Sequence, residues 1–263
     1  MKSLLNRIGF GRRAGTDAAR LAGGTFAAQT DPGLRRTSNQ DQALATQLPD
    51  GSVLLAVADG VGGAAGGDVA AALAIEEVVG VFSRGDGGDP VVLLREAFEA
   101  ANRRVLQVGT EVPELEGLAS TLVVAVIGAT TARVAHVGDS RAYVYDTGLL
   151  QQITNDHTWT AERVRAGQMS EEEAANSPFR HTITRGVGVA AEVAPDISEG
   201  IDLSDDGVVL LCSDGLYGPA ASEEIVATLT SGPHAEAPAR LIALANQHGG
   251  PDNIGIAIYT VRS

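Results

Sequence analysis

Several aspartates stand next to short apolar runs, in positions that correspond to the ends of β-strands. They are Asp59, Asp139, Asp214 and Asp252, which adjoin the apolar runs 53–58, 133–137, 207–212 and 254–259. A glycine adjoins three of the four, and glycine lets the backbone turn sharply and approach a ligand closely. If these strand ends share one edge of the fold, the carboxylates converge there.

Converging carboxylates repel one another unless a cation lies between them. Oxygen ligands with no histidine or cysteine nearby select hard ions such as Mg²⁺ or Mn²⁺. Two such ions can lower the pKa of a bridging water and neutralise a phosphoryl group during in-line attack. The pattern therefore favours a two-metal hydrolytic centre, although a single Asp-Gly at a strand end is also ordinary turn chemistry.

Arg36 lies in a loop before Asp41 and a strand-like stretch, from which its side chain could reach the same edge. The planar guanidinium suits bidentate binding of a phosphate. An arginine in a loop is more often a solvated surface charge. Arg36 is therefore a phosphate-binding candidate only in combination with the aspartates.

The elements that must position these residues are short strands rich in Val, Ile and Leu, together with a few helices. The predicted strands are 53–58, 121–127, 133–137, 142–146, 207–212 and 254–259. Between residues 120 and 153 strand follows strand across tight polar turns, which predicts an antiparallel meander rather than a doubly wound sheet. Helices are predicted after the capping residues Asp89, Ser170 and Ser222, and over 235–247. We expect an α/β (α+β) fold with a central antiparallel β-sandwich flanked on both faces by helices.

The overall composition excludes several classes of protein. The chain has 263 residues, of which 44% are hydrophobic, and a net charge of −14. It can bury a large core, and its charge repels phosphate backbones, so nucleic acid is not an expected partner. The single cysteine, Cys212, lies in an apolar run, which favours a reducing compartment. No apolar stretch approaches the roughly 20 residues that cross a membrane, so we expect a cytoplasmic monomer without a membrane span.

The N-terminal residues differ from the rest of the chain in charge. Basic residues outnumber acidic ones over residues 1–36, and this stretch lacks the apolar core of a secretory signal. We interpret residues 1–22 as a flexible basic tail, with an amphipathic helix that contacts an acidic partner or a membrane surface as the alternative. Residues 23–261 contain no internal repeat or long linker and are predicted to form one catalytic domain.

A series of short motifs follows in order along the chain. The motifs are RTSNQD at 36–41, VADGVGG at 57–63, STL at 120–122, GDSR at 138–141, DHT at 156–158, SDG at 213–215 and DNI at 252–254. The series resembles the ordered motifs of the bacterial PPM family, the type 2C metal-dependent serine/threonine protein phosphatases. The resemblance extends over about residues 24–260, and the ordered set is far more specific than any one string.

The resemblance implies a β-sandwich with helices on both outer faces and a two-metal centre of Mn²⁺ or Mg²⁺ at one end. It implies that Asp59 bridges both ions and that the Gly60 carbonyl binds the second. Asp214 and Asp252 would complete the shell of the first ion. Arg36 would hold the substrate phosphate.

Two further acids match family positions outside this core. Asp139, together with Asp214, matches the acidic pair that binds a third, weaker ion in bacterial members. Asp41 matches the acid that contacts metal-bound water. Gln40 and Val61 depart from the eukaryotic pattern, which has a glutamate and a histidine there. Valine donates no proton, so the leaving hydroxyl would be protonated by solvent or metal-bound water, as is usual in the bacterial branch.

Residues of about 158–185 match the family's flap, a mobile segment beside the active site that influences substrate choice. Their polar composition, interrupted by Gly167 and Pro178, agrees with this. Trp159 is a candidate substrate platform, with a packing anchor for the flap as the plainer interpretation. His157 is a candidate proton donor or flap contact, with an orienting hydrogen bond as the plainer interpretation.

The activity that the resemblance implies is hydrolysis of phosphoserine and phosphothreonine in proteins. A metal-bridging water would attack in a single step without a phosphoenzyme, and the enzyme would oppose a bacterial serine/threonine kinase. Cys212 is followed by Ser213-Asp214 rather than by a loop of phosphate donors, so it is not a candidate nucleophile. Two alternatives remain at this point: a regulatory module that binds phosphoproteins or a kinase without hydrolysis, and a phosphatase of an anti-anti-sigma-type regulator.

Overall fold

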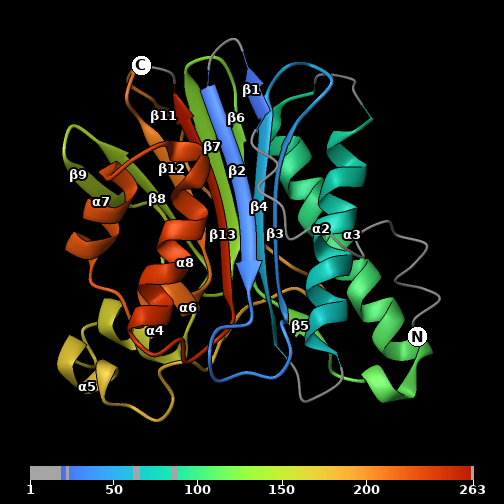
Figure 1. Ribbon diagram of the computed structural model, residues 1–263. Helices are drawn as coiled ribbons and strands as arrows, with labels where there is room; N and C mark the ends of the chain where they lie inside the picture. The colour runs from blue at the N-terminus through green and yellow to red at the C-terminus, as the bar shows by residue number, and fades with distance from the viewer. Residues whose placement is uncertain (1–18, 22–23, 62–65, 85–87, 262–263) are drawn as a thin grey trace.

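The computed structural model describes residues 19–21, 24–61, 66–84 and 88–261, which form two antiparallel sheets packed face to face (Figure 1). The first sheet has the strand order β1-β2-β13-β12-β8-β9. Its strands are β1 (Ala19–Leu21), β2 (Gly24–Asp31), β13 (Ile254–Val261), β12 (Val208–Cys212), β8 (Arg141–Asp146) and β9 (Leu149–Gln152).

The second sheet has the order β10-β7-β6-β4-β3, with β11 paired to β7 and β5 paired to β4. Its strands are β10 (Asp196–Ile197), β7 (Thr131–Val137), β6 (Leu122–Ile127), β4 (Val53–Val61), β3 (Asp41–Gln47), β11 (Ile201–Asp202) and β5 (Ala119–Ser120). The predicted meander is present, because β6 pairs with β7, and β8 pairs with β9, in antiparallel register.

Helices cover the outer face of each sheet (Figure 1). The long helices α2 (Gly67–Phe82) and α3 (Pro90–Glu111) pack on the sheet that contains β4, while α7 (Ser222–Thr230) and α8 (Ala237–Gln247) pack on the other. The short helices are α4 (Trp159–Arg165), α5 (Glu171–Ala175) and α6 (Asp214–Tyr217), with single 3-10 turns at Pro113–Leu115 and His234–Glu236. The predicted helix-flanked β-sandwich is confirmed.

Strands with both faces buried explain why the sequence contains continuous apolar runs. In β4, Leu54 and Ala56 pack outward against the α2/α3 layer, whereas Leu55 and Val57 pack inward against the opposite sheet. Successive residues of a strand point to opposite faces, so a strand between two packed layers must be apolar at every position.

Local capping sets the starts of two predicted helices. The Asp89 carboxylate accepts the Val91 N–H at 2.9 Å ahead of Pro90, the first residue of α3. At the start of α5, the Ser170 hydroxyl and the Glu173 carboxylate exchange hydrogen bonds with each other's backbone N–H groups, which forms the predicted capping box.

The N-terminal tail lies mostly outside the described residues. Residues 19–21 pair with β2 as β1, whereas residues 1–18, 22 and 23 lie outside the described part. Residues 62–65, which include the end of the motif at 57–63, also lie outside it. No helix of the described part is long and apolar enough to span a membrane.

Candidate metal centre

Strand register brings Asp41 and Asp59 together in the sheet that contains β4. Asp41 is the first residue of β3, and its Cα pairs with that of Asp59 near the end of β4. The backbone of Asp59 is held by Thr121, which accepts its N–H through Oγ1 and donates its own N–H to the Asp59 carbonyl, each at 2.9 Å. The two carboxylates therefore project from a rigid strand pair.

The other sheet places the remaining acids at the same end. Cys212, the last residue of β12, pairs with Arg141 on one side and with Ile256 on the other. Asp214 therefore follows β12 between the turn that carries Asp139, just before Arg141, and the segment that carries Asp252, just before β13. The predicted convergence of the strand ends is present in the fold.

Hydrogen bonds cross between the sheets beneath these acids. The Ser213 hydroxyl donates to Asp41 Oδ2 at 2.6 Å and accepts the Gly255 N–H at 2.8 Å. The Asn253 side chain accepts the Gln40 N–H at 2.9 Å and donates to the Ser38 carbonyl at 2.8 Å. The loop before β3 is thus fixed to the segment before β13, so the acids from the two sheets keep one arrangement.

Burial and mutual repulsion raise the pKa values of three of these carboxyl groups. Asp41 is 1% exposed, and burial, followed by the charges of Asp214 and Asp252, raises its pKa to about 7 against the hydrogen bond from Ser213. Burial and the charge of Asp41 raise the pKa of Asp59 well above its ordinary value. Burial and the charge of Asp214 raise the pKa of Asp139 to about 7.

The residues fit a divalent metal centre. The donor set consists of carboxylate oxygens, which hard cations prefer. Asp41 Oδ1 is buried and has no hydrogen-bond partner among the described residues, so it is an oxygen that the protein itself leaves unsatisfied. Cations between these carboxylates would reverse the repulsion that raises their pKa values.

Arg36 reaches the rim of the cluster. Its Nη2 donates to Asp252 Oδ2 at 2.7 Å, and its side chain is 53% exposed. The guanidinium therefore combines contact with the acids and access to solvent, as a phosphate-binding group requires.

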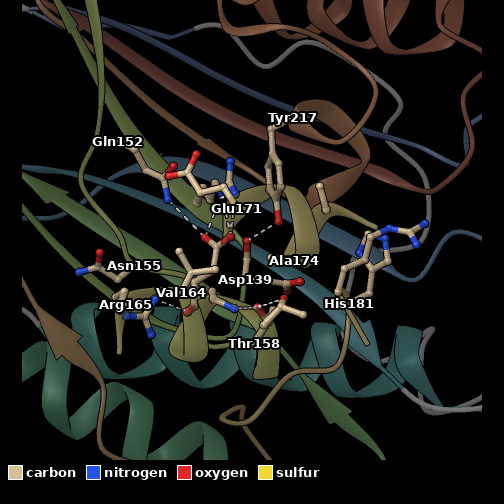
Figure 2. Close-up of a pocket in the computed structure, with 16 residues that line it drawn as sticks. Asp139, Gln152, Asn155, Thr158, Val164, Arg165, Glu171, Ala174, His181 and Tyr217 are labelled. Atoms are coloured by element: carbon tan, nitrogen blue, oxygen red, sulfur yellow. Dashed lines mark hydrogen bonds and ion pairs between the residues drawn. The ribbon is translucent and has the colours of Figure 1, made fainter. Parts of the chain in front are cut away.

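A pocket of about 380 Å³ lies between Asp139 and the flap (Figure 2). Asp139, Arg141 and Tyr217 line it from the sandwich, and the flap helices α4 and α5 line it from the other side. The Tyr217 hydroxyl donates to the Asp139 carbonyl at 2.8 Å and so fixes the turn that carries this acid. The pocket opens directly beside the predicted third-ion position.

His181 is a residue of this site that the sequence analysis missed. Its Nδ1 lies 3.3 Å from Asp214 Oδ2, and one ligand atom each of Asp139, His181 and Asp214 lie within 4.8 Å of one another. The hydrogen bond with Asp214 raises the pKa of His181. No local pattern around His181 indicates this contact, because only the folding of the flap over the sandwich brings it there.

The two candidate residues of the flap, His157 and Trp159, lie outside the pocket. Neither His157 nor Trp159 is among the described residues that line the pocket. Trp159 packs against Phe179, with ring centroids 5.4 Å apart, and beneath the Arg163 guanidinium at 3.8 Å. This geometry agrees with the interpretation of Trp159 as a packing anchor. His157 is 2% exposed, and its hydrogen bonds agree with an orienting role.

Comparison with known proteins agrees with this geometry. A model of the family described as protein phosphatase 2C matches residues 34–240. The chain is 37% identical over 236 residues to the serine/threonine protein phosphatase PstP of Mycobacterium tuberculosis, covering 90% of this chain and 45% of PstP. It is 33% identical over 235 residues to a putative protein phosphatase 2C-type protein of Streptococcus pyogenes, covering 88% of this chain and 94% of that protein.

Among solved structures, the catalytic domain of PstP in complex with two manganese ions superposes with a TM-score of 0.81 at 34% identity, covering 92% of this chain and 99% of that one. The chain therefore belongs to the protein phosphatase 2C family. The resemblance to this family seen in the ordered motifs is confirmed, because the bacterial proteins that the chain matches include serine/threonine phosphatases of this family. The chain spans about half the length of PstP.

The raised pKa values predict that the metal-free protein loses stability as pH rises from about 4 to about 7. Asp41 and Asp139 have pKa values of about 7 in the folded chain against an ordinary 3.8. The folded state therefore holds more protons than the unfolded state across this interval, and the free energy of unfolding falls with pH. Mn²⁺ should restore a stability on the order of a few kcal/mol at neutral pH.

Urea unfolding with EDTA or Mn²⁺, at about pH 5 and about pH 7, measures this effect. The Asp139→Asn variant is the matched control and should show a shallower loss in EDTA. A metal-free stability that stays constant between these pH values would contradict the electrostatic description of the cluster.

Proposed function

We propose that this chain hydrolyses phosphoserine and phosphothreonine in proteins with the help of divalent metal ions. The observation that carries the proposal is the convergence of five buried or half-buried carboxylates at one end of the sandwich, with the guanidinium of Arg36 at their rim. Carboxylates in this number suit cations, and an exposed arginine beside them suits a phosphate.

The proposed metal ligands are those of the family motifs. Asp59, the Gly60 carbonyl, Asp214 and Asp252 would hold two core ions, Mn²⁺ or Mg²⁺, and Asp139 with Asp214 would hold a third, weaker ion. When bound, such ions activate water for attack on phosphorus and neutralise the phosphoryl charge. Asp41 would accept a hydrogen bond from water at this centre through the Oδ1 atom that the protein leaves unpaired.

The chain's own residues bind and orient the phosphate. Arg36 would exchange its contact with Asp252 for two parallel N–H donors to the phosphate oxygens. Val61 is 40% exposed and donates no proton, so the leaving hydroxyl takes its proton from the solvent side of the site. The partners we propose are phosphorylated proteins and an antagonistic serine/threonine kinase. We further propose that the chain acts in the cytoplasm as a monomer.

The first test is hydrolysis of a phosphothreonine peptide by the purified protein in EDTA, Mg²⁺ or Mn²⁺. We expect turnover only with metal, and loss of turnover in the Asp214→Ala variant. Rapid quenching should yield no phosphorylated enzyme, because water attacks phosphorus directly. Peptide binding without turnover in any metal would instead support a regulatory module that recognises phosphoproteins.

Arg36→Ala is expected to raise the KM for the phosphopeptide by about tenfold, because a charge-assisted bidentate contact with phosphate is lost. The Ki of inorganic phosphate as a competitive inhibitor should rise by the same factor. Arg35→Ala is the matched control, since Arg35 is an adjacent exposed arginine whose backbone N–H bonds to the Gly250 carbonyl. If the KM and the Ki were the same in the two variants, the assignment of Arg36 as a phosphate-binding residue would be wrong.

A further inference from the structure

The two ends of the flap meet at its base. Thr158 and Ile183 form an isolated antiparallel bridge. On either side of the bridge, the Trp159 N–H donates to the Thr182 carbonyl at 2.9 Å and the Thr184 N–H donates to the His157 carbonyl at 2.8 Å. The flap is therefore a loop whose orientation is set by a narrow base, beside His157 at its start and Arg185 at its end.

The imidazole of His157 connects this base to the sandwich. It is buried and stacks on His136 of β7, with ring centroids 4.6 Å apart. Its Nδ1 accepts the Gly138 N–H at 3.2 Å, and the His157 N–H donates to the Gly138 carbonyl at 3.0 Å. Gly138 immediately precedes Asp139, so the base of the flap contacts the turn that carries this acid.

The other ring nitrogen of His157 faces a charged pair. Nε2 lies 2.7 Å from Arg185 Nη1 and 3.1 Å from Asp196 Oδ2. Arg185 and Asp196 are themselves ion-paired at 2.9 Å, and Arg185 also donates to the Ala194 carbonyl. Asp196 opens β10 and pairs with β7 opposite His136, so the pair joins the end of the flap to the edge of a sheet.

A metal ion is a poor occupant of this cluster, although His136, His157 and Asp196 offer ligand atoms within 4.8 Å of one another. The two rings are stacked nearly parallel, at 12°, so their lone pairs do not converge on one point. His136 Nε2 is already hydrogen-bonded to the Asn155 carbonyl at 2.9 Å. The Arg185 guanidinium supplies the cation that the Asp196 carboxylate requires.

We propose that His157, Arg185 and Asp196 form a clamp that positions the flap over the pocket beside the metal centre and thereby determines how a phosphoprotein segment docks there. All three are positioning residues. None of them lines the pocket itself, and they act on it by holding the flap. The proposal rests on the proposed phosphatase function, since it concerns the substrate of that same site.

The clamp predicts that large and small substrates respond differently. In the proposed site a phosphopeptide would reach across the pocket to α4 and α5, whereas para-nitrophenyl phosphate would occupy only the phosphate position. In Arg185→Ala we expect the KM for the phosphopeptide to rise by about tenfold, while kcat/KM for para-nitrophenyl phosphate changes less than about twofold. Asp196→Ala should change the KM in the same direction. The double variant should lose less than the product of the two single losses, because the two side chains share one ion pair.

The single tryptophan of the chain supplies a readout that is independent of activity. Trp159 lies at the start of the flap and is half-buried. In Arg185→Ala its emission should shift to longer wavelength and acrylamide should quench it more strongly, because the anchored flap becomes more exposed. Circular dichroism confirms that each variant is folded.

Arg84→Ala is the matched control. It removes an ion pair of similar length, 2.7 Å to Glu96, on the α2/α3 side of the molecule away from α4 and α5 (Figure 1). It should leave both the kinetics and the Trp159 emission unchanged. Unchanged Trp159 emission and phosphopeptide KM in Arg185→Ala would overturn the clamp, as would an equal loss of activity on both substrates. If the wild type hydrolyses neither substrate with any metal, the phosphatase proposal fails, while the emission still tests the clamp.

Discussion

Replacing Asp59 with asparagine is expected to lower metal-dependent phosphopeptide turnover by about 10³-fold or more, while the protein remains folded. Asp59 is the carboxylate on which the charges of Asp41, Asp139, Asp214 and Asp252 all act, and it is the proposed bridge between two ions. Asparagine keeps the shape of the side chain but removes the charge that would hold the ions. Initial rates over a range of Mn²⁺ concentrations measure the effect.

The same substitution should leave the metal-free protein as stable as the wild type or more so. Burial and like charges raise the pKa of the Asp59 carboxyl group. A neutral side chain at this position therefore relieves repulsion inside the cluster. Urea unfolding in EDTA tests this. A loss of activity together with an unchanged or higher stability would show that Asp59 serves function rather than folding.

Asp202→Asn is the matched control for this prediction. Asp202 is exposed and pairs with Thr131 at the start of β7, the end of the strand opposite to the metal centre. It should retain the rate and the metal dependence of the wild type. A rate near the wild-type value in Asp59→Asn would show that the assignment of this metal centre is wrong.

Gly215→Ala is expected to destabilise the protein by about 3 kcal/mol or more and to abolish activity. A Cβ at this position would lie 1.9 Å from the Asn253 carbonyl oxygen, which is part of a backbone that cannot rotate away. The segments that carry Asp214 and Asp252 would have to separate, and the carboxylates would no longer converge. Denaturant unfolding and Mn²⁺-dependent turnover measure the two losses.

Gly80→Ala is the control for this prediction, and we expect it to change stability in the opposite direction. Gly80 lies in α2, and a Cβ there meets no atom within 4 Å. Alanine in an exposed helix position should stabilise the protein by about 0.5–1 kcal/mol and leave turnover unchanged. If Gly215→Ala resembled Gly80→Ala in stability and rate, the close backbone crossing beneath the acids would not be needed for the site.

The strength of the sequence signal for a strand depended on how the strand is buried. β4, β6 and β12 are covered on both faces, which requires apolar residues throughout and makes their runs easy to recognise. No predicted run covers β2, and β9 was implied only as the last strand of the meander that ends near residue 153. β2 contains Gln29, Thr30 and Asp31 among small residues, and it forms a strand because β13 pairs with it along its whole length. β9 is a largely exposed edge strand.

The residues of the candidate site also differ in how clearly the sequence indicated them. Asp139 and Asp214 follow strands whose ends are visible in the sequence, and Asp59 lies near the end of another such strand, so the strands position all three. His181 and Arg185 lie in irregular segments, and Asp196 opens the two-residue strand β10. No periodic pattern in the sequence links these residues to one another.

By itself, the amino-acid sequence determined the sandwich, its helical layers and the acids at the strand ends, because burial on both faces and sharp turns impose residue types locally. The tertiary structure alone decided which groups meet across the two sheets. The Ser213 hydroxyl and the Asp41 carboxylate, 172 residues apart, are 2.6 Å apart in the fold. Such contacts depend on strand register and on the packing of one sheet against the other, and these are properties of the whole chain rather than of any segment.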